Sequence, residues 1–135
     1  MQFQSVSSLF AIVALFSAMA AAAPATKRKH EYSGVATWYS PKHNGGTKAA
    51  CYGEHIDDDS NIVALNAPQY GDLGSNSDWC GKKIEIEGPN GKARASILDA
   101  CPECDDGSLD LTPALFTKVV GDKDIGQGDI TWRVL

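Results

Sequence analysis

The sequence lacks a second long apolar run, and this absence limits how the chain can meet a membrane. The one long apolar run, Leu9 to Ala23, ends in small residues that suit signal-peptidase cleavage. It is shorter than the roughly 20 residues that a membrane-spanning helix needs. We therefore predict a secretory signal peptide at residues 1–23 and a secreted, extracellular protein without a membrane anchor.

Basic residues are also scarce, with 12 Lys and Arg against 17 Asp and Glu. All the acidic residues follow Arg28, so loss of an N-terminal leader would leave the chain still more acidic. An acidic surface attracts neither nucleic acid nor anionic membranes. We expect neither as a partner, whereas neutral polysaccharide remains compatible with this charge.

Residues 24–30 separate the apolar segment from the rest of the chain. The pair Lys27-Arg28 resembles a dibasic processing site, so this segment is either a propeptide or a basic, disordered leader that is retained. The remaining residues, 31–135, are enough for one small domain with a modest core.

The four cysteines all follow the leader, and in a secreted chain they predict two disulfides. Three pairings are possible. A zinc site is the competing interpretation, but there is one Cys-x-x-Cys, at Cys101 and Cys104, with no His at ligand spacing beside it. We expect no metal and no cofactor.

Short apolar or alternating segments between glycine-rich and proline-rich turns predict an all-β fold. The predicted strands are residues 34–39, 62–65, 83–87, 93–98, 109–111 and 129–135. Thr112 as N-cap and Pro113 at the first helical position predict one short helix over residues 114–120. Six short strands and one helix are typical of a small closed or nearly closed β-barrel, but periodicity does not say which barrel.

Two carboxylates stand out in residues 95–112. Asp99 ends an apolar run, and Asp110 lies between two leucines in a segment that should be half-buried. A half-buried charge must face a groove or be satisfied by hydrogen bonds. The pair therefore predicts either an acid/base site or a polysaccharide-binding groove.

Several segments in one order resemble the double-psi β-barrel of the expansin first domain, of rare-lipoprotein-A-like proteins and of barwin. They are Gly34–Tyr39, Ile62–Asn66, Cys80–Ile86, Ile97–Pro102, Leu109–Phe116 and Ile130–Val134. The chain looks most like the single-domain secreted fungal members, which are the loosenin-like and rare-lipoprotein-A-like proteins. The resemblance implies a six-stranded double-psi barrel over residues 31–135, with disulfides pairing Cys51 with Cys80 and Cys101 with Cys104.

The resemblance also implies a role for named residues. In expansins the aspartate of the Leu-Asp-Leu segment is the one most closely tied to wall loosening, and Asp110 matches it; Asp99 matches a second groove carboxylate. Thr37, Trp38 and Tyr39 fall in the first-strand motif, where expansins place groove hydroxyls and an aromatic residue. The alternatives are helix capping for Asp110, a turn for Asp99, and core packing for Trp38 and Tyr39.

A glycosidase needs two carboxylates on either side of the scissile bond. Residues 34–48 contain no acid, so the first-strand aspartate of endoglucanases with this barrel is missing. Glu54 resembles a glutamate of bacterial rare lipoprotein A, but the histidine expected near Leu65 is absent. Glycan cleavage, by Glu54 or Asp99 with Asp110, is therefore not the favoured activity.

We expect a monomeric, non-hydrolytic, expansin-like protein that binds and loosens cellulose, chitin or peptidoglycan. We expect no second, carbohydrate-binding domain of the expansin kind, and therefore weak binding to insoluble polymer. An inhibitor of papain-type cysteine proteases is the second hypothesis, with the loop of residues 70–78 as its contact face. A lytic, glycan-cleaving enzyme is the third.

Overall fold

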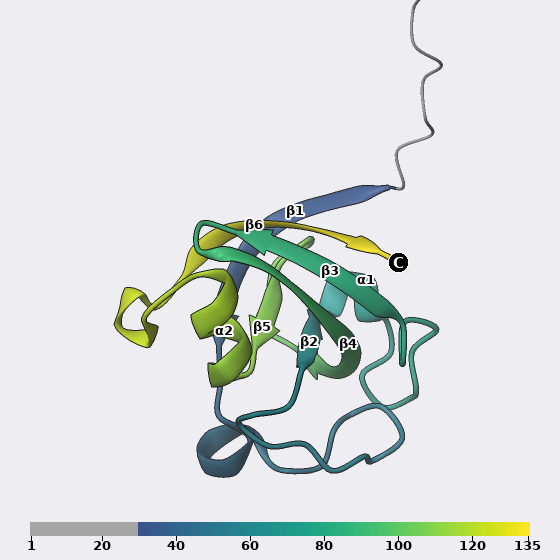
Figure 1. Ribbon diagram of the computed structural model, residues 1–135. Helices are drawn as coiled ribbons and strands as arrows, with labels where there is room; N and C mark the ends of the chain where they lie inside the picture. Colours follow the sequence, from purple (N-terminus) through teal and green to yellow (C-terminus); the bar gives the residue numbers. More distant parts are fainter. Residues whose placement is uncertain (1–29) are drawn as a thin grey trace, which may run out of the picture.

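The computed structural model describes residues 30–135, so the predicted signal peptide and almost all of the leader lie outside the described residues. The strands are β1 (Glu31–Trp38), β2 (Ile62–Asn66), β3 (Lys83–Gly88), β4 (Gly91–Cys101), β5 (Leu109–Leu111) and β6 (Gly128–Val134) (Figure 1). The helices are α1 (Ala67–Tyr70) and α2 (Pro113–Val119), with a π-turn at Pro41–Gly45 and a 3-10 turn at Lys123–Ile125. Among these residues, no helix is both long and apolar enough to cross a bilayer.

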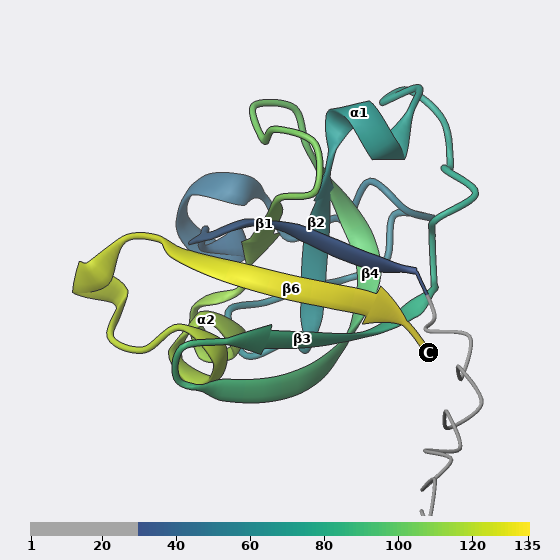
Figure 2. The same ribbon diagram turned by 90° about the horizontal axis from the view of Figure 1, so that it is seen from above.

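The six strands close into a barrel in the order β1-β5-β2-β4-β3-β6 (Figures 1 and 2). Two neighbouring pairs are parallel, β1 with β5 and β2 with β4, and the other four are antiparallel. The predicted closed barrel with a short helix is confirmed. Because β5 lies between β1 and β2, segments from both ends of the domain lie side by side.

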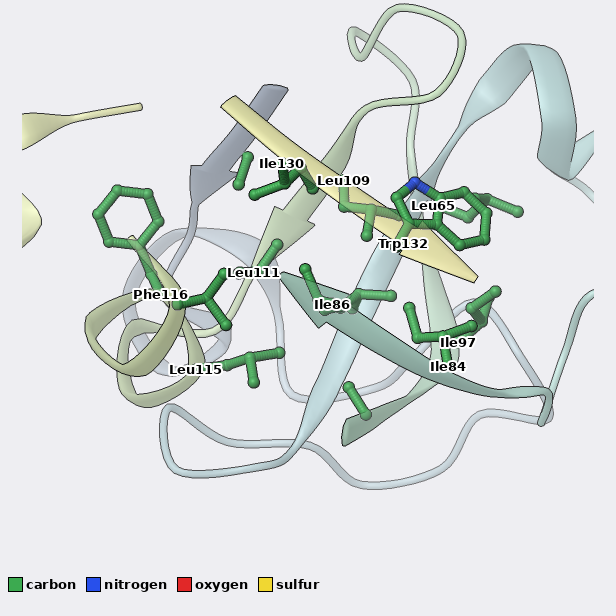
Figure 3. Close-up of a cluster of buried hydrophobic side chains, with 14 of the residues drawn as sticks. Leu65, Ile84, Ile86, Ile97, Leu109, Leu111, Leu115, Phe116, Ile130 and Trp132 are labelled. Carbon is green, nitrogen blue, oxygen red and sulfur yellow. The ribbon is translucent and has the colours of Figure 1, made fainter. Parts of the chain in front are cut away.

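Alternation along the strands puts apolar side chains into the barrel. In β3, Ile84 and Ile86 are fully buried while the flanking Lys83 and Glu87 are exposed, as the two-residue period of a strand requires. The same inward face on the other strands and the apolar face of α2 complete the core in Figure 3, where Trp132 is the largest fully buried side chain.

β4 is longer than the alternation predicts. It continues to Cys101 because its second half stays paired with β2, with Ala64 opposite Asp99 and Asn66 opposite Cys101. Asp99 therefore lies inside a strand rather than after it. β1 likewise begins at Glu31, ahead of the predicted start at Gly34.

Helix α2 begins at Pro113 as predicted, but Thr112 does not cap it with its side chain. The Thr112 hydroxyl instead donates to the carbonyl of Ser60, at 2.7 Å, and ties the start of the helix to the segment before β2. The single-turn helix α1, capped by the side chain of Asn66, was not predicted.

Candidate functional site

The first contact of the site joins β1 to β5. The parallel pairing sets Thr37 opposite Asp110, and the Thr37 hydroxyl donates to Oδ1 of Asp110 at 2.9 Å. Both side chains point outward because their neighbours Ala36, Leu109 and Leu111 fill the core. No helix amide is needed to hold this carboxylate, because a hydroxyl 73 residues away in the sequence does so.

The second contact joins the end of β1 to β4. Tyr39 shares the outward face of Thr37, and its hydroxyl donates to Oδ2 of Asp99 at 2.7 Å. The backbone amide of Ala50 donates to the other oxygen of Asp99 at 3.0 Å. Burial, with the charges of Asp99 and Asp110, raises the pKa of Tyr39 well above its usual range. The phenol therefore stays a donor, and both oxygens of Asp99 are occupied.

Two adjoining cavities open around Asp110. The first, of about 470 Å³, is lined by Val35, Thr37, Cys101, Glu103, Cys104, Asp105, Ser108, Asp110 and Gln127. The second, of about 300 Å³, is lined by Tyr39, Asn44, Gly45, Ala64, Ala100, Cys101, Pro102, Glu103 and Asp110. Cys101, Glu103 and Asp110 border both cavities. We call the two cavities together the groove, and Asp110 lies at their junction.

The ionisation of Asp110 is set by its position in the groove. The pKa of Asp110 is raised to about 6, because burial and, to a smaller extent, the charge of Asp99 outweigh the opposing hydrogen bonds from Thr37 and the backbone of Leu111. A neutral carboxyl donates a hydrogen bond and an ionised one only accepts. Asp110 can therefore serve as donor or acceptor within the pH range around its pKa.

A disulfide between Cys101 and Cys104 forms the wall next to Asp110. A carboxylate oxygen of Asp110 and the two sulfur atoms all lie within 4.8 Å of one another. Metal binding by cysteine needs thiolates, and both sulfurs are used in the bridge, so the cluster does not fit a metal centre.

The segment between this bridge and β5 is fixed to the barrel by buried hydrogen bonds. The hydroxyl of Ser108 accepts from the amide of Val35 at 3.1 Å, and its carbonyl accepts from Nδ2 of Asn66 at 3.0 Å. The carbonyl of Gly107 accepts from the indole of Trp132 at 2.8 Å. The groove wall therefore rests on a rigid scaffold.

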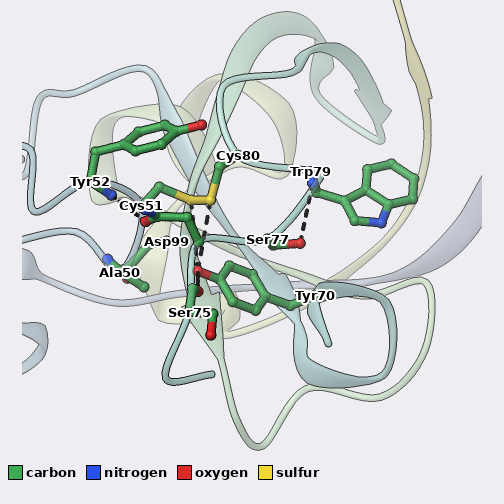
Figure 4. The surroundings of a disulfide bond; sticks show 10 residues. Ala50, Cys51, Tyr52, Tyr70, Ser75, Ser77, Trp79, Cys80 and Asp99 are labelled. Atoms are coloured by element: carbon green, nitrogen blue, oxygen red, sulfur yellow. Dashed lines mark hydrogen bonds between the residues drawn. A yellow bond between two sulfur atoms is a disulfide. The ribbon is translucent and has the colours of Figure 1, made fainter. Parts of the chain in front are cut away.

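The other disulfide, Cys51–Cys80, borders neither cavity of the groove, and Figure 4 shows its surroundings. It ties the segment after Ala50 to the loop that precedes β3. The hydroxyl of Tyr70 donates to the carbonyl of Ser75 at 2.9 Å and lies 3.7 Å from the sulfur of Cys80. The cysteine pairing is the one that the family resemblance implies.

The structure does not bring every predicted site residue into the groove. Trp38 faces the opposite side of β1, where its indole N–H donates to the carbonyl of Lys123 and the Lys123 ammonium lies 5.1 Å from its ring. Glu54 is exposed on the turn after Cys51 and borders neither cavity. Strand alternation alone separates Trp38 from Thr37 and Tyr39.

Several groove residues were not predicted from the sequence. Glu103 lies between the two bridged cysteines, a position that becomes visible once that bridge is assigned. Asp105, Gln127 and the amide of Ala50 carry no sequence signal, because loops far apart in the chain bring them to the groove.

Comparisons with known proteins identify related chains. Expansin-YoaJ of Bacillus subtilis is 35% identical over 104 residues, which cover 77% of this chain and 43% of that protein. The papain inhibitor of Streptomyces mobaraensis is 33% identical over 105 residues, which cover 75% of this chain and 69% of that protein. The chain spans about half the length of several curated relatives it matches. No family model matches the chain.

Solved structures share the fold. A Streptomyces papain inhibitor matches with a TM-score of 0.66 and 29% identity, over 78% of this chain and 94% of that one. An expansin of Clavibacter michiganensis, also solved as a mutant in complex with cellohexaose, matches with a TM-score of 0.65 and 30% identity, over 78% of this chain and 50% of that one. The barrel is therefore of the predicted double-psi type.

Proposed function

Because the chain belongs to the family of double-psi β-barrel proteins that includes the Streptomyces papain inhibitor and is homologous to expansins, we propose that it binds cell-wall polysaccharide. The binding site is the groove around Asp110. More specifically, we propose that it is a loosenin-like protein, which weakens the contacts between polymer chains without cleaving the chains.

The observation that carries this proposal is the position of Asp110 between two adjoining cavities. A polymer of repeating sugars fits such a groove, with neighbouring units on either side of one central carboxylate. Thr37 and Asp110 supply hydrogen-bonding groups, and the ring of Tyr39 lines the second cavity. The Clavibacter expansin, which this chain matches over half of that protein's length, was solved in complex with cellohexaose, and this supports a glucan as the ligand to test.

The arrangement of the carboxylates supports a non-hydrolytic action. A glycosidase needs one carboxyl as acid and a second as base or nucleophile across the bond. Asp99 borders neither cavity, and its two oxygens accept hydrogen bonds from Tyr39 and Ala50, which hold this carboxylate away from a sugar in the groove. Glu54 borders neither cavity, and of the carboxyls that line the groove Glu103 and Asp105 are exposed, whereas Asp110 is half-buried.

Charge favours an uncharged polymer. Glu103, Asp105 and Asp110 line the groove, and a polymer that carries carboxylates would meet like charge there. Cellulose or chitin therefore suits the groove better than peptidoglycan.

Binding of three purified polymers tests the proposal. Wild-type protein should sediment with cellulose or chitin more than with peptidoglycan, and Asp110→Asn should weaken binding at least tenfold, about 1.4 kcal/mol. Asp106→Asn is the matched control, because it removes the same charge from an exposed residue that borders neither cavity.

Wild-type protein and Asp106→Asn should weaken filter paper more than Asp110→Asn does, and none of them should release reducing sugar. Equal binding by wild type and Asp110→Asn would contradict the groove, and reducing sugar released at enzymatic rates would contradict the non-hydrolytic mechanism.

A second candidate is inhibition of a papain-type cysteine protease. The papain inhibitor is a relative that the chain covers over most of its length. Tyr52 is 59% exposed and has a positive φ of 60°. Its amide is held by Asn76 at 2.8 Å, next to the Cys51–Cys80 bridge. A rigid loop with an exposed aromatic side chain is a suitable contact for another protein.

Papain inhibition tests this candidate directly. Tyr52→Asn should abolish inhibition and keep the fold, because asparagine tolerates a positive φ. The control is Ile125→Ala, which removes an exposed apolar side chain from the 3-10 turn at Lys123–Ile125 instead of from the loop of Tyr52. Wild-type protein without effect on papain would remove the hypothesis.

Secretion belongs to the same proposal. Two disulfides are typical of proteins from oxidising compartments, and both are present in the barrel. N-terminal sequencing of exported protein should give a start after the apolar segment, at Pro24 or at Lys29. A start at Met1 would contradict the signal peptide.

A further inference from the structure

We propose that the Cys101–Cys104 bridge is a thiol-exchange site inside the groove, opened by a small neutral or cationic thiol at a rate controlled by the charge of Asp110. This proposal does not depend on polysaccharide binding. It rests on the arrangement of one disulfide, one carboxyl and one cavity.

Access comes from the cavity. Both cysteines line the 470 Å³ cavity, and Cys104 is more exposed than Cys101, which is 9% exposed. An incoming thiolate therefore reaches the sulfur of Cys104 more readily. The bridge closes a loop across a separation of only 3 residues, and both of its cysteines border the cavity.

The Cys51–Cys80 bridge is the natural comparison within the same molecule. Cys51 is fully buried, and neither Cys51 nor Cys80 lines the groove. Exchange needs direct approach to a sulfur atom. The two bridges should therefore differ strongly in their rates of reduction.

The reaction balances as an ordinary two-electron exchange. The thiolate of a dithiol attacks Sγ of Cys104, the bond between the two protein sulfurs breaks, and Cys101 leaves as a thiolate that takes up a proton. The second thiolate of the reagent then displaces Cys104, which releases the protein dithiol and the oxidised, cyclic reagent. The external dithiol supplies both electrons.

Asp110 controls this step through the leaving sulfur. The developing charge on Cys101 lies within 4.8 Å of the carboxyl. A neutral Asp110 can donate a hydrogen bond to that charge, whereas an ionised Asp110 repels it. Since the pKa of Asp110 is raised to about 6, this change falls in an accessible pH range.

The other groups that face Asp110 do not cancel its effect. Thr37 donates to it, Tyr39 stays protonated, and Asp99 adds a negative charge from β4. Glu103 and Asp105 line the same cavity from the loop. The acidic surroundings should repel an anionic thiol such as glutathione and admit a neutral or cationic one.

The test measures reduction of each bridge separately. The folded protein is treated with dithiothreitol between pH 5 and 8, quenched with an alkylating reagent and mapped by mass spectrometry, and rates are divided by the reagent's thiolate concentration. Cys101–Cys104 should open at least tenfold faster than Cys51–Cys80. Its normalised rate should fall about tenfold as pH rises through 6.

The variants decide whether Asp110 is responsible. In Asp110→Asn the normalised rate should lose its dependence on pH and exceed the wild-type rate at pH 8. Asp106→Asn should behave as wild type. At equal thiolate concentration and pH 8, cysteamine should react several-fold faster than glutathione.

Equal reduction of the two bridges, or faster reduction of Cys51–Cys80, would overturn the proposal. A wild-type pH profile retained in Asp110→Asn would overturn the role of Asp110. Circular dichroism of the untreated variants verifies that the rates refer to folded protein.

Discussion

The two disulfide-bridged regions of this barrel do different work. Cys51–Cys80 joins residues separated by 29 positions and includes a fully buried sulfur, whereas Cys101–Cys104 spans 3 positions and lines the groove beside Asp110. The first bridge restrains much of the unfolded chain. The second restrains little of it and instead fixes the wall of a site. Similar covalent chemistry thus serves stability in one place and geometry in the other.

Removal of the long bridge should have the largest effect on stability. In the chain-entropy model, Cys51→Ser with Cys80→Ser costs about 4 kcal/mol of unfolding free energy. Urea unfolding measures this loss, and polysaccharide binding per folded molecule should not change. A loss smaller than that for the short bridge would break the comparison.

Asp110→Asn should stabilise the protein and yet weaken binding. A carboxyl with a raised pKa holds its proton more tightly in the folded state, so ionisation costs folded-state stability as pH rises from about 4 to about 6. With a pKa near 6 against an ordinary 3.8, this cost reaches at most about 3 kcal/mol above pH 6. Asparagine removes it and still accepts from Thr37.

Unfolding curves at pH 4 and pH 8 measure this difference. The variant should exceed the wild type at pH 8 and match it at pH 4. A variant less stable than wild type at pH 8 would mean that ionisation of Asp110 does not destabilise the folded protein.

Loss of the short bridge should cost about 2 kcal/mol, because its loop is small. Cys101→Ser with Cys104→Ser should nevertheless weaken polysaccharide binding as much as Asp110→Asn does. Sedimentation with cellulose or chitin, beside urea unfolding, separates the two effects. Full binding in this variant would remove the geometric role of the short bridge.

Tyr39→Phe should give the smallest change. It removes the hydrogen bond to Asp99 and keeps the ring, at a cost of about 1 kcal/mol. The amide of Ala50 still donates to Asp99 in this variant, so this carboxylate should keep its position. We therefore expect only small losses, both in the free energy of unfolding and in binding. Isothermal titration with a soluble glucan oligomer measures the binding part.

The sequence was sufficient to predict where the strands lie, but not which strands pair with one another. Alternation in residues 83–87 and the Leu-Asp-Leu segment predicted β3 and β5, because each has a face that must be buried. Pairing of β1 with β5 could not be predicted from periodicity, since it joins Thr37 to a residue 73 positions later. The family resemblance assigned Thr37 and Asp110 to one groove but did not predict the contact between them.

Other details depended on tertiary contacts. Thr112 has the residue type and position of an N-cap, but its hydroxyl donates to the carbonyl of Ser60 instead. Trp38 stood among the first-strand groove residues, yet its place on β1 turns it toward Lys123. Whether Asp110 and Asp99 act on polysaccharide stays a prediction that the experiments above test.

The barrel order also bears on how the protein folds. β1 hydrogen-bonds with β5 and β6, so the first strand of the described chain can pair only after the last two have been synthesised. Contacts between segments so distant in sequence make folding slow. The groove can form only after β1 and β5 meet, so it should be among the last parts of a newly made molecule to assemble. Partly synthesised chains that lack β5 and β6 would therefore present β1 unpaired.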